Sequence, residues 1–188
     1  METVEAIQDI HQINLMKQYL KEHSKRDYLL FVIGINTGLK ISELLEMKMA
    51  ELIDENGMVR DYYYIPENED CLEKEVFLNK RVKEAVFYYV NENLNKTHTY
   101  LFQSAKSNKP ITRQQAYRII HNAAEAVGIS GKIGTNSMRK TFGYHAYKQG
   151  VAITLLQKHF HHATPSETMK YIGISKNEVI RTAIDVNL

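Results

Sequence analysis

The sequence predicts a mainly α-helical fold with one small antiparallel β-sheet. Over most of the chain, apolar residues recur three and four positions apart, as they do on one face of a helix. Between residues 58 and 78 this spacing gives way to two short apolar runs on either side of an acidic stretch, which is typical of a hairpin. The 188 residues suit one domain of ordinary size, and no Pro- or Gly-rich linker divides them. We therefore expect a single domain over residues 1–188.

The first half of the chain begins with helical patterns. The apolar face of the first helix consists of Leu15, Met16, Tyr19 and Leu20. A second helix, expected to be buried, contains the apolar run 28–33 and ends near Gly38. The apolar residues of a third helix are Ile41, Leu44 and Leu45. Strands are expected over residues 58–65 and 73–78, with the acidic residues 66–70 in the turn between them. In the tyrosine run 62–64, alternation predicts side chains that pack and face solvent in turn, and base-stacking residues are the alternative. A helix with Val82, Val86, Tyr89 and Val90 on one face follows.

The second half continues with a short strand at residues 100–102. Thr112 and Gln115 have the spacing of a capping box, which opens a helix that ends at Gly128. The next helices are expected from near Ser137 to Gly150 and from about residue 152 to residue 159.

A short helix with strong capping signals lies in the segment 159–174. Thr164 suits the N-cap and Pro165 the first helical position, Glu167 completes a capping box, and Gly173 ends the helix. Ser175 and Glu178 then open a last helix over residues 176–186. Its apolar face would suit either docking on a neighbouring protomer or packing on its own core.

Composition excludes several classes of protein. No apolar run approaches the roughly 20 residues of a membrane span, and no secretory signal is recognisable. The single cysteine, Cys71, allows no internal disulfide. We therefore expect a cytoplasmic protein. The net charge is only +2. Residues 103–148 nevertheless hold eight Lys and Arg residues against one acid, Glu125, which is typical of a nucleic-acid-binding face. The alternative is a solvated helix surface, which is the better interpretation of any one of these lysines taken alone.

Four segments contain the residues of a possible active site. They are Thr-Gly-Leu-Lys-Ile-Ser-Glu-Leu at 37–44, Asn-Ser-Met-Arg at 136–139, Leu-Leu-Gln-Lys at 155–158, and His-Ala-Thr-Pro-Ser-Glu-Thr-Met-Lys-Tyr at 162–171. In order and spacing they resemble the motifs of the tyrosine recombinases, also called phage integrases, over about residues 28–175. The resemblance implies the α+β catalytic-domain fold of DNA breaking-rejoining enzymes. It also implies site-specific recombination or integration through a 3′-phosphotyrosine link.

The resemblance implies a role for each matching residue. Tyr171 matches the nucleophile, Arg139 the second arginine and His162 the late histidine. Lys40 stands in place of the first arginine, and Asn136 in place of the early histidine. Lys74, just before the second strand segment, is the nearest match to the hairpin lysine. No metal and no nucleotide cofactor is implied; the implied partners are double-stranded DNA and further copies of the chain, as a dimer or tetramer.

The departures leave a second hypothesis open. Lys40 lacks the forked guanidinium with which an arginine holds two phosphate oxygens. Asn136 cannot transfer a proton near neutral pH. The acidic turn of the expected hairpin should repel phosphate. Under this second hypothesis the chain is a degenerate homologue that only binds DNA. A third hypothesis is an unrelated helical interaction module. The DNA-binding residues expected outside the catalytic set are Lys140, Arg113 and Arg118.

Two other features allow more than one interpretation. The histidines at 145, 159, 161 and 162 suggest a zinc site, which we disfavour because no cysteine or carboxylate accompanies them. The resemblance leaves no room for the N-terminal clamp domain that family members usually have, so the chain is either a catalytic domain alone or a fragment.

Overall fold

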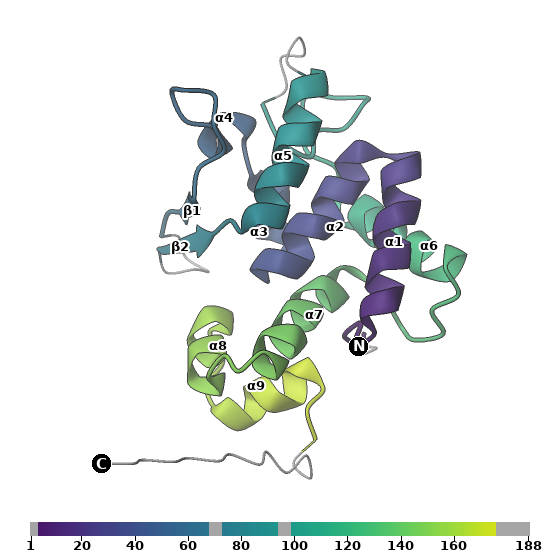
Figure 1. Ribbon diagram of the computed structural model, residues 1–188, viewed down its shortest axis with the longest axis vertical. Coiled ribbons are helices and arrows are strands. Elements are labelled where there is room, and N and C mark those ends of the chain that lie inside the picture. Colours follow the sequence, from purple (N-terminus) through teal and green to yellow (C-terminus); the bar gives the residue numbers. More distant parts are fainter. Residues whose placement is uncertain (1–3, 68–72, 94–98, 176–188) are drawn as a thin grey trace.

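The computed structural model describes residues 4–67, 73–93 and 99–175, and most of these are helical (Figure 1). In chain order the elements are α1 (Ile10–His23), α2 (Lys25–Thr37), α3 (Ile41–Glu46), α4 (Met49–Leu52), β1 (Tyr62–Ile65), β2 (Lys74–Phe77), α5 (Lys80–Asn93), α6 (Arg113–Ala126), α7 (Thr135–Lys148), α8 (Ile153–Phe160) and α9 (Pro165–Ile172). The expected fold class, mainly α with a small antiparallel sheet, is confirmed.

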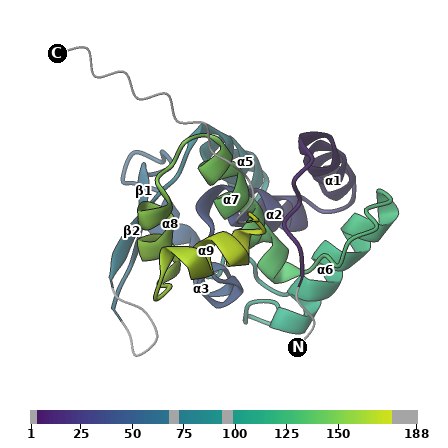
Figure 2. The same cartoon turned by 90° about the horizontal axis from the view of Figure 1, so that it is seen from below.

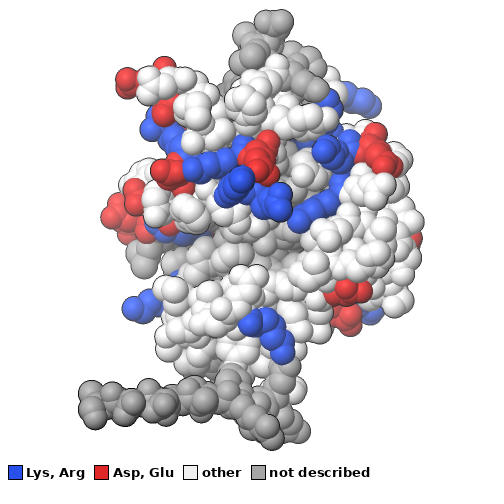
Figure 3. Space-filling model, viewed as in Figure 1, with Lys and Arg blue, Asp and Glu red and all other residues white. Residues whose placement is uncertain are grey.

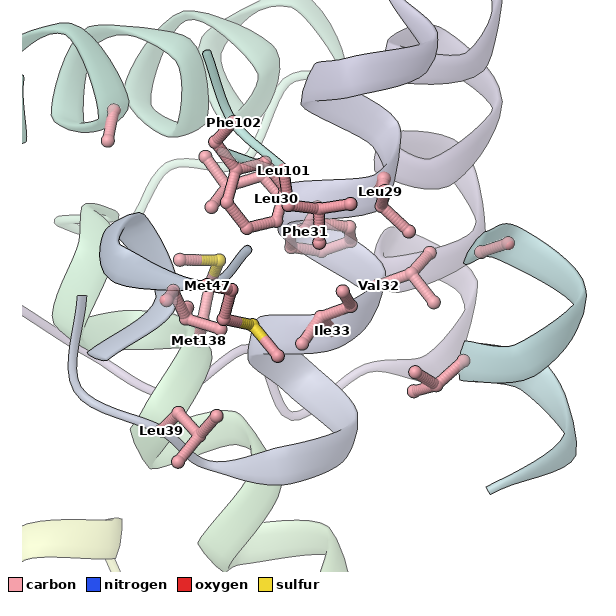
Figure 4. Packing of buried hydrophobic residues seen from close by; sticks show 14 of the residues in the cluster. Leu29, Leu30, Phe31, Val32, Ile33, Leu39, Met47, Leu101, Phe102 and Met138 are labelled. Atoms are coloured by element: carbon pink, nitrogen blue, oxygen red, sulfur yellow. The ribbon is translucent and has the colours of Figure 1, made fainter. Parts of the chain in front are cut away.

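Helix α2 is the centre of the larger hydrophobic core. Residues 29–34 of this helix are all buried, so it is apolar on every side and packs against α1, α5 and α7. Figure 4 shows Met47 and Met138 beside the side chains of α2. The approach of α7 is close: a β-carbon on Gly34 would lie 2.6 Å from the sulfur of Met138. The α2–α7 contact thereby fixes the position of the helix that carries Arg139.

A second, smaller core joins α8 and α9 to the C-terminal part of α7. It consists of Leu156, Phe160, Ile172 and Ile174, with partly buried residues of α7 packed against them. In Figures 1 and 2 these three helices lie together, and Figure 1 shows them apart from α4 and α5. Helix α7 belongs to both cores, so it connects the segment with Tyr171 to the rest of the molecule.

The sheet consists of β1 and β2, paired antiparallel with Tyr63 opposite Val76. These two residues face the core, whereas Tyr62 and Tyr64 are about half exposed, at 52% and 53%. The predicted alternation of packed and solvent-facing tyrosines is therefore confirmed. The hairpin turn that we expected over residues 66–70 lies mostly outside the described residues.

Two expected strands differ from the structure. The first was expected from residue 58 but begins at Tyr62, because Val59 instead forms an isolated bridge with Ile53. The strand expected at residues 100–102 is wrong: Tyr100 makes a single bridge with Lys48, and Leu101 and Phe102 lie in a turn. Both turn residues are fully buried, so their apolar character reflects core packing and not strand pairing.

Helix boundaries are close to those expected. The Thr112–Gln115 capping box is present, and Gly38 and Gly173 end α2 and α9 in the left-handed conformation. Helix α7 begins at Thr135, ahead of the expected Ser137, because the Ser137 hydroxyl accepts a hydrogen bond from the backbone N–H of Gly134 and serves as a cap from inside the helix.

Thr164 caps α9 as expected, but Glu167 accepts from the N–H of Ala163 and not from that of Thr164. The expected helix over residues 176–186 lies outside the described residues. None of the helices in the described part of the chain is both long and apolar enough to cross a membrane.

Candidate active site

Arg139 is a buried cation that joins two parts of the molecule. Its side chain projects from α7 and the residue is only 5% exposed. One guanidinium nitrogen, Nη1, donates to the carbonyl of Gly38, and Nη2 donates to the carbonyl of Phe160 at 3.1 Å. The guanidinium carbon also lies 4.6 Å from the centre of the Phe160 ring. The end of α2 and the end of α8 therefore meet at one arginine, whose charge is shielded from water.

Tyr171 lies beside this arginine. Burial raises the pKa of the Tyr171 phenol, and the charge of Arg139 and a hydrogen bond between the two side chains oppose that shift. The rings of Tyr171 and His162 meet edge to face with centroids 4.9 Å apart. On another side, Nζ of Lys140 is 5.1 Å from the centre of the Tyr171 ring and donates to the carbonyl of Val4 at 2.8 Å.

The orientation of His162 follows from a chain of hydrogen bonds. Its Nδ1 atom is 3.0 Å from Oγ1 of Thr168, and that hydroxyl donates to the carbonyl of Thr164 at 3.3 Å. Because the Thr168 hydroxyl donates its one proton to that carbonyl, its oxygen can only accept from Nδ1 of His162. Nδ1 therefore carries the proton of the neutral ring, and Nε2 is left as a proton acceptor. Burial lowers the pKa of His162, and Arg139 and His161 lower it further against the opposing charge of Glu167. His162 is thus neutral at neutral pH.

Lys40 and Lys74 are brought together by a glutamate that the sequence analysis did not assign a role. Nζ of Lys74 is 2.8 Å from Oε1 of Glu43, and the other oxygen, Oε2, accepts from the backbone N–H of Lys40 at 2.7 Å. Burial would raise the pKa of Glu43, but these hydrogen bonds and the charges of Lys74 and Arg139 outweigh it and lower that pKa. Glu43 stands in the Ile-Ser-Glu-Leu part of the segment 37–44, and that motif is the signal by which the sequence could have identified it as a site residue.

His159 connects the same two helix ends as Arg139. Its Nε2 atom donates to the carbonyl of Thr37 at 2.8 Å, which fixes the tautomer. Burial, assisted by the charges of Arg139 and Lys74, lowers the pKa of His159 to about 4. The zinc alternative finds no support here, because no three His, Cys, Asp or Glu residues converge on a metal position within the described ranges; His145, for example, bonds to the carbonyl of Ile7.

The other expected residues lie at exposed positions of α7 and α6. Asn136 is exposed on the first turn of α7, one turn before Arg139. Arg113 and Arg118 are exposed on α6, where Arg118 lines a surface pocket with Arg26 and Lys106. On the face drawn in Figure 3, Lys and Arg side chains gather over α1, α2 and α5, with acidic side chains among them.

Comparison with known proteins gives a consistent result. The model of the phage integrase family matches residues 7–178. The probable integrase/recombinase YoeC of Bacillus subtilis is 37% identical over 177 residues, which are 94% of this chain and 93% of that protein. Tyrosine recombinase XerC of Thermodesulfovibrio yellowstonii is 24% identical, and the match covers 83% of this chain but only 52% of XerC.

Solved structures show the same fold. XerA recombinase superposes with a TM-score of 0.76 at 17% identity, over 94% of this chain and 61% of that one. XerH recombinase bound to its palindromic difH substrate, in a post-cleavage complex, gives 0.74 at 17% identity, over 93% of this chain and 51% of that one. The chain thus spans about half to three fifths of the length of these solved chains.

Proposed function

The chain belongs to the phage integrase family, and from this premise we propose that it cuts and rejoins duplex DNA through Tyr171. The observation that supports the proposal most is the position of the Tyr171 phenol, which shares a hydrogen bond with buried Arg139 and packs against neutral His162. An acceptor of the phenolic proton and a cation for the phosphate are therefore both neighbours of one nucleophile.

The reaction begins with attack of the Tyr171 oxygen on a DNA phosphorus. A bond forms between the tyrosine oxygen and phosphorus, and the bond from phosphorus to the 5′ oxygen breaks. The phenolic proton passes to Nε2 of His162, the nitrogen that Thr168 leaves unprotonated. The leaving 5′ oxygen takes up a proton from a donor beside it, so the products are a 3′-phosphotyrosine link and a free 5′ hydroxyl. The same steps in reverse rejoin the strand, and the covalent link conserves the energy of the bond.

Positive side chains stabilise the charge that develops on the phosphate. Arg139 exchanges its hydrogen bond with Tyr171 for one with a phosphate oxygen, and Lys40 supplies a second charge from the N-terminus of α3. Asn136, exposed one turn before Arg139 on α7, donates a hydrogen bond through its amide. Lys74 enters the site when phosphate competes with Glu43 for its ammonium group.

The wider DNA contacts belong to the same proposal. Lys140, Arg113 and Arg118 bind the phosphate backbone, and the described residues act as one catalytic domain.

Two solved relatives support DNA as the partner: XerH in complex with difH, and a lambda integrase dimer bound to a core site. We extend the proposal to self-association of this chain on DNA, as a dimer or tetramer.

A suicide DNA substrate, which loses its 5′ end after cleavage, tests the proposal. The wild-type protein should accumulate a covalent adduct that survives denaturation, and Tyr171→Phe should form none. Tyr19→Phe, on α1 and outside the site, is the matched control and should form adduct at the wild-type rate. Undiminished adduct from Tyr171→Phe would contradict the role of Tyr171.

A second candidate function, DNA binding without cleavage, is favoured by Lys40, Asn136 and the ion pair of Lys74 with Glu43. The double variant Lys40→Arg/Asn136→His separates the two. If the wild-type protein is a slow enzyme, restoring a forked cation and a proton carrier should raise the rate of adduct formation, by about 10²-fold or more. Salt-dependent DNA binding without adduct from either protein would leave binding as the function.

A further inference from the structure

His161 has a backbone conformation that its side chain disfavours. It ends α8 with φ 57° and ψ 41°, and it is the one non-glycine residue with positive φ in the described part of the chain. The two other helices that end in this left-handed conformation have glycine there, at Gly38 and Gly173. A side chain at such a position strains the backbone, and strained residues cluster at functional sites.

The carbonyl of Phe160 accepts from Arg139 and the ring of His162 packs against Tyr171, so the residue between them in the chain, His161, is part of the candidate active site. Lys74 from β2, Lys40 from the start of α3 and Arg139 from α7 all act on it electrostatically, with Glu43 of α3 as the opposing charge and His162 adjacent in the chain. The residue is exposed, unlike Arg139 and His159. An exposed imidazole on a strained turn of the backbone therefore lies within electrostatic range of three cations of the candidate active site.

We propose that His161 is a further catalytic residue, which lies against the scissile phosphate and donates its proton to the 5′ oxygen as that oxygen leaves. The inference rests on the proposed function. As the bond from phosphorus to the 5′ oxygen breaks, the imidazolium of His161 becomes neutral and the leaving oxygen becomes a hydroxyl. His162 holds the phenolic proton meanwhile, so protons balance across the step, and rejoining reverses both transfers.

The other residues near the phosphate are less suited to this step. Asn136 carries no proton that it can give up near neutral pH. Lys74 reaches the phosphate only by giving up its ion pair with the carboxylate of Glu43 at 2.8 Å, and Arg139 does not release a proton in proteins.

The charge state of His161 depends on the same cations. Partial shielding of the imidazole from water, followed by the charges of Lys74, Lys40 and Arg139, lowers the pKa of His161 in the free protein. A DNA phosphate neutralises those cations, so DNA binding raises this pKa again and favours the protonated form that the step requires.

The test compares two substrates and two variants. His161→Gly and His161→Asn both tolerate the left-handed conformation, so each should fold with an unfolding midpoint at or above that of the wild-type protein. With saturating suicide substrate, both should form adduct about 10²–10⁴-fold more slowly than wild type. In the second substrate sulfur replaces the 5′ bridging oxygen. Because sulfur leaves without a proton, both variants should cleave it at close to the wild-type rate.

His11→Gln is the matched control: the residue is exposed on α1, and this variant should match wild type on both substrates. Wild-type rates for the His161 variants on the oxygen substrate would overturn the inference. An equal defect on both substrates would also overturn it, because His161 would then bind phosphate without donating a proton. A wild-type protein that forms no adduct with either substrate would overturn the proposed function itself, and the inference with it.

Discussion

The Nζ atom of Lys74 lies 2.8 Å from Oε1 of Glu43, and the two side chains are only 13% and 10% exposed. This ion pair connects the β-hairpin to the start of α3, where the second oxygen of Glu43 accepts the backbone N–H of Lys40. One carboxylate therefore positions both lysines that the reaction is proposed to use. It also restrains Lys74, so the pair affects both stability and reactivity.

Glu43→Gln should lower the free energy of unfolding by about 1–3 kcal/mol, because it leaves Lys74 without its partner in a shielded position. The effect depends on pH. Since the pKa of Glu43 is lowered below 4.5 in the fold, its charge stabilises the fold above about pH 4.5, and this contribution disappears as the pH falls through the folded pKa. Urea denaturation at a series of pH values should show a weaker acid dependence in the variant. Glu84→Gln, which removes an exposed partner of Arg81, should change little.

His159→Gln should make the stability of the protein less sensitive to mild acid. The pKa of His159 is about 4 in the fold, against 6.5 for an ordinary histidine. Between these two values the unfolded chain binds a proton that the folded protein excludes, so stability falls as the pH drops from 6.5 towards 4, by up to about 3 kcal/mol. Glutamine can still donate to the carbonyl of Thr37 but does not titrate. Equal pH dependence in wild type and variant would show that His159 is not held neutral.

Thr168→Val should slow adduct formation about 10-fold or more, because the hydroxyl that holds Nδ1 of His162 is lost and the acceptor nitrogen is no longer directed. Valine has nearly the same shape, so the buried site is still filled and stability should fall by only about 1 kcal/mol. Thr154→Val, at an exposed position of α8, is the matched control. A Thr168→Val protein with the wild-type rate and a wild-type pH profile would contradict this orientation of His162.

Gly143→Ala should detach the nucleophile segment from α7. A β-carbon at this position would lie 2.6 Å from Ile172 of α9 and 2.7 Å from Phe160 of α8. Overpacking of this kind costs about 1–3 kcal/mol, which exceeds the gain in helix propensity from alanine. Adduct formation should fall together with the unfolding midpoint. In Gly131→Ala the new carbon comes too close only to the end of the flexible Glu5 side chain and makes an ordinary contact with Ile133, so that control should keep wild-type activity.

Much of the fold was predictable because local signals agree with the packing. Thr112, Thr164 and Gly173 cap their helices as expected, and the period of the apolar residues identified the helices around α2. The turn at Leu101 and Phe102 was missed because a short apolar run looks the same in a strand and in a buried turn. Only long-range contacts, such as the bridge between Lys48 and Tyr100, distinguish the two.

The sequence pointed to residues that the structure brings together, and their catalytic roles stay predictions; the connections between them were not predictable. Motif order placed Arg139, His162 and Tyr171, and the structure brings them together. The sequence does not show that Glu43 binds Lys74, because the partners are 31 residues apart. It likewise does not show that His159 meets the carbonyl of Thr37, or that His161 has positive φ. These features depend on how α2, α7 and α8 meet at one point.

The most direct test of the central claim is the mapping of the DNA adduct to a residue. After reaction with a suicide substrate and digestion with nuclease and trypsin, mass spectrometry should find the nucleotide remnant on the peptide 171–176, which follows Lys170 and contains Tyr171 as its one tyrosine. The account predicts the remnant at that tyrosine. A remnant on Tyr144 or Tyr147, or on a residue outside this peptide, would contradict it.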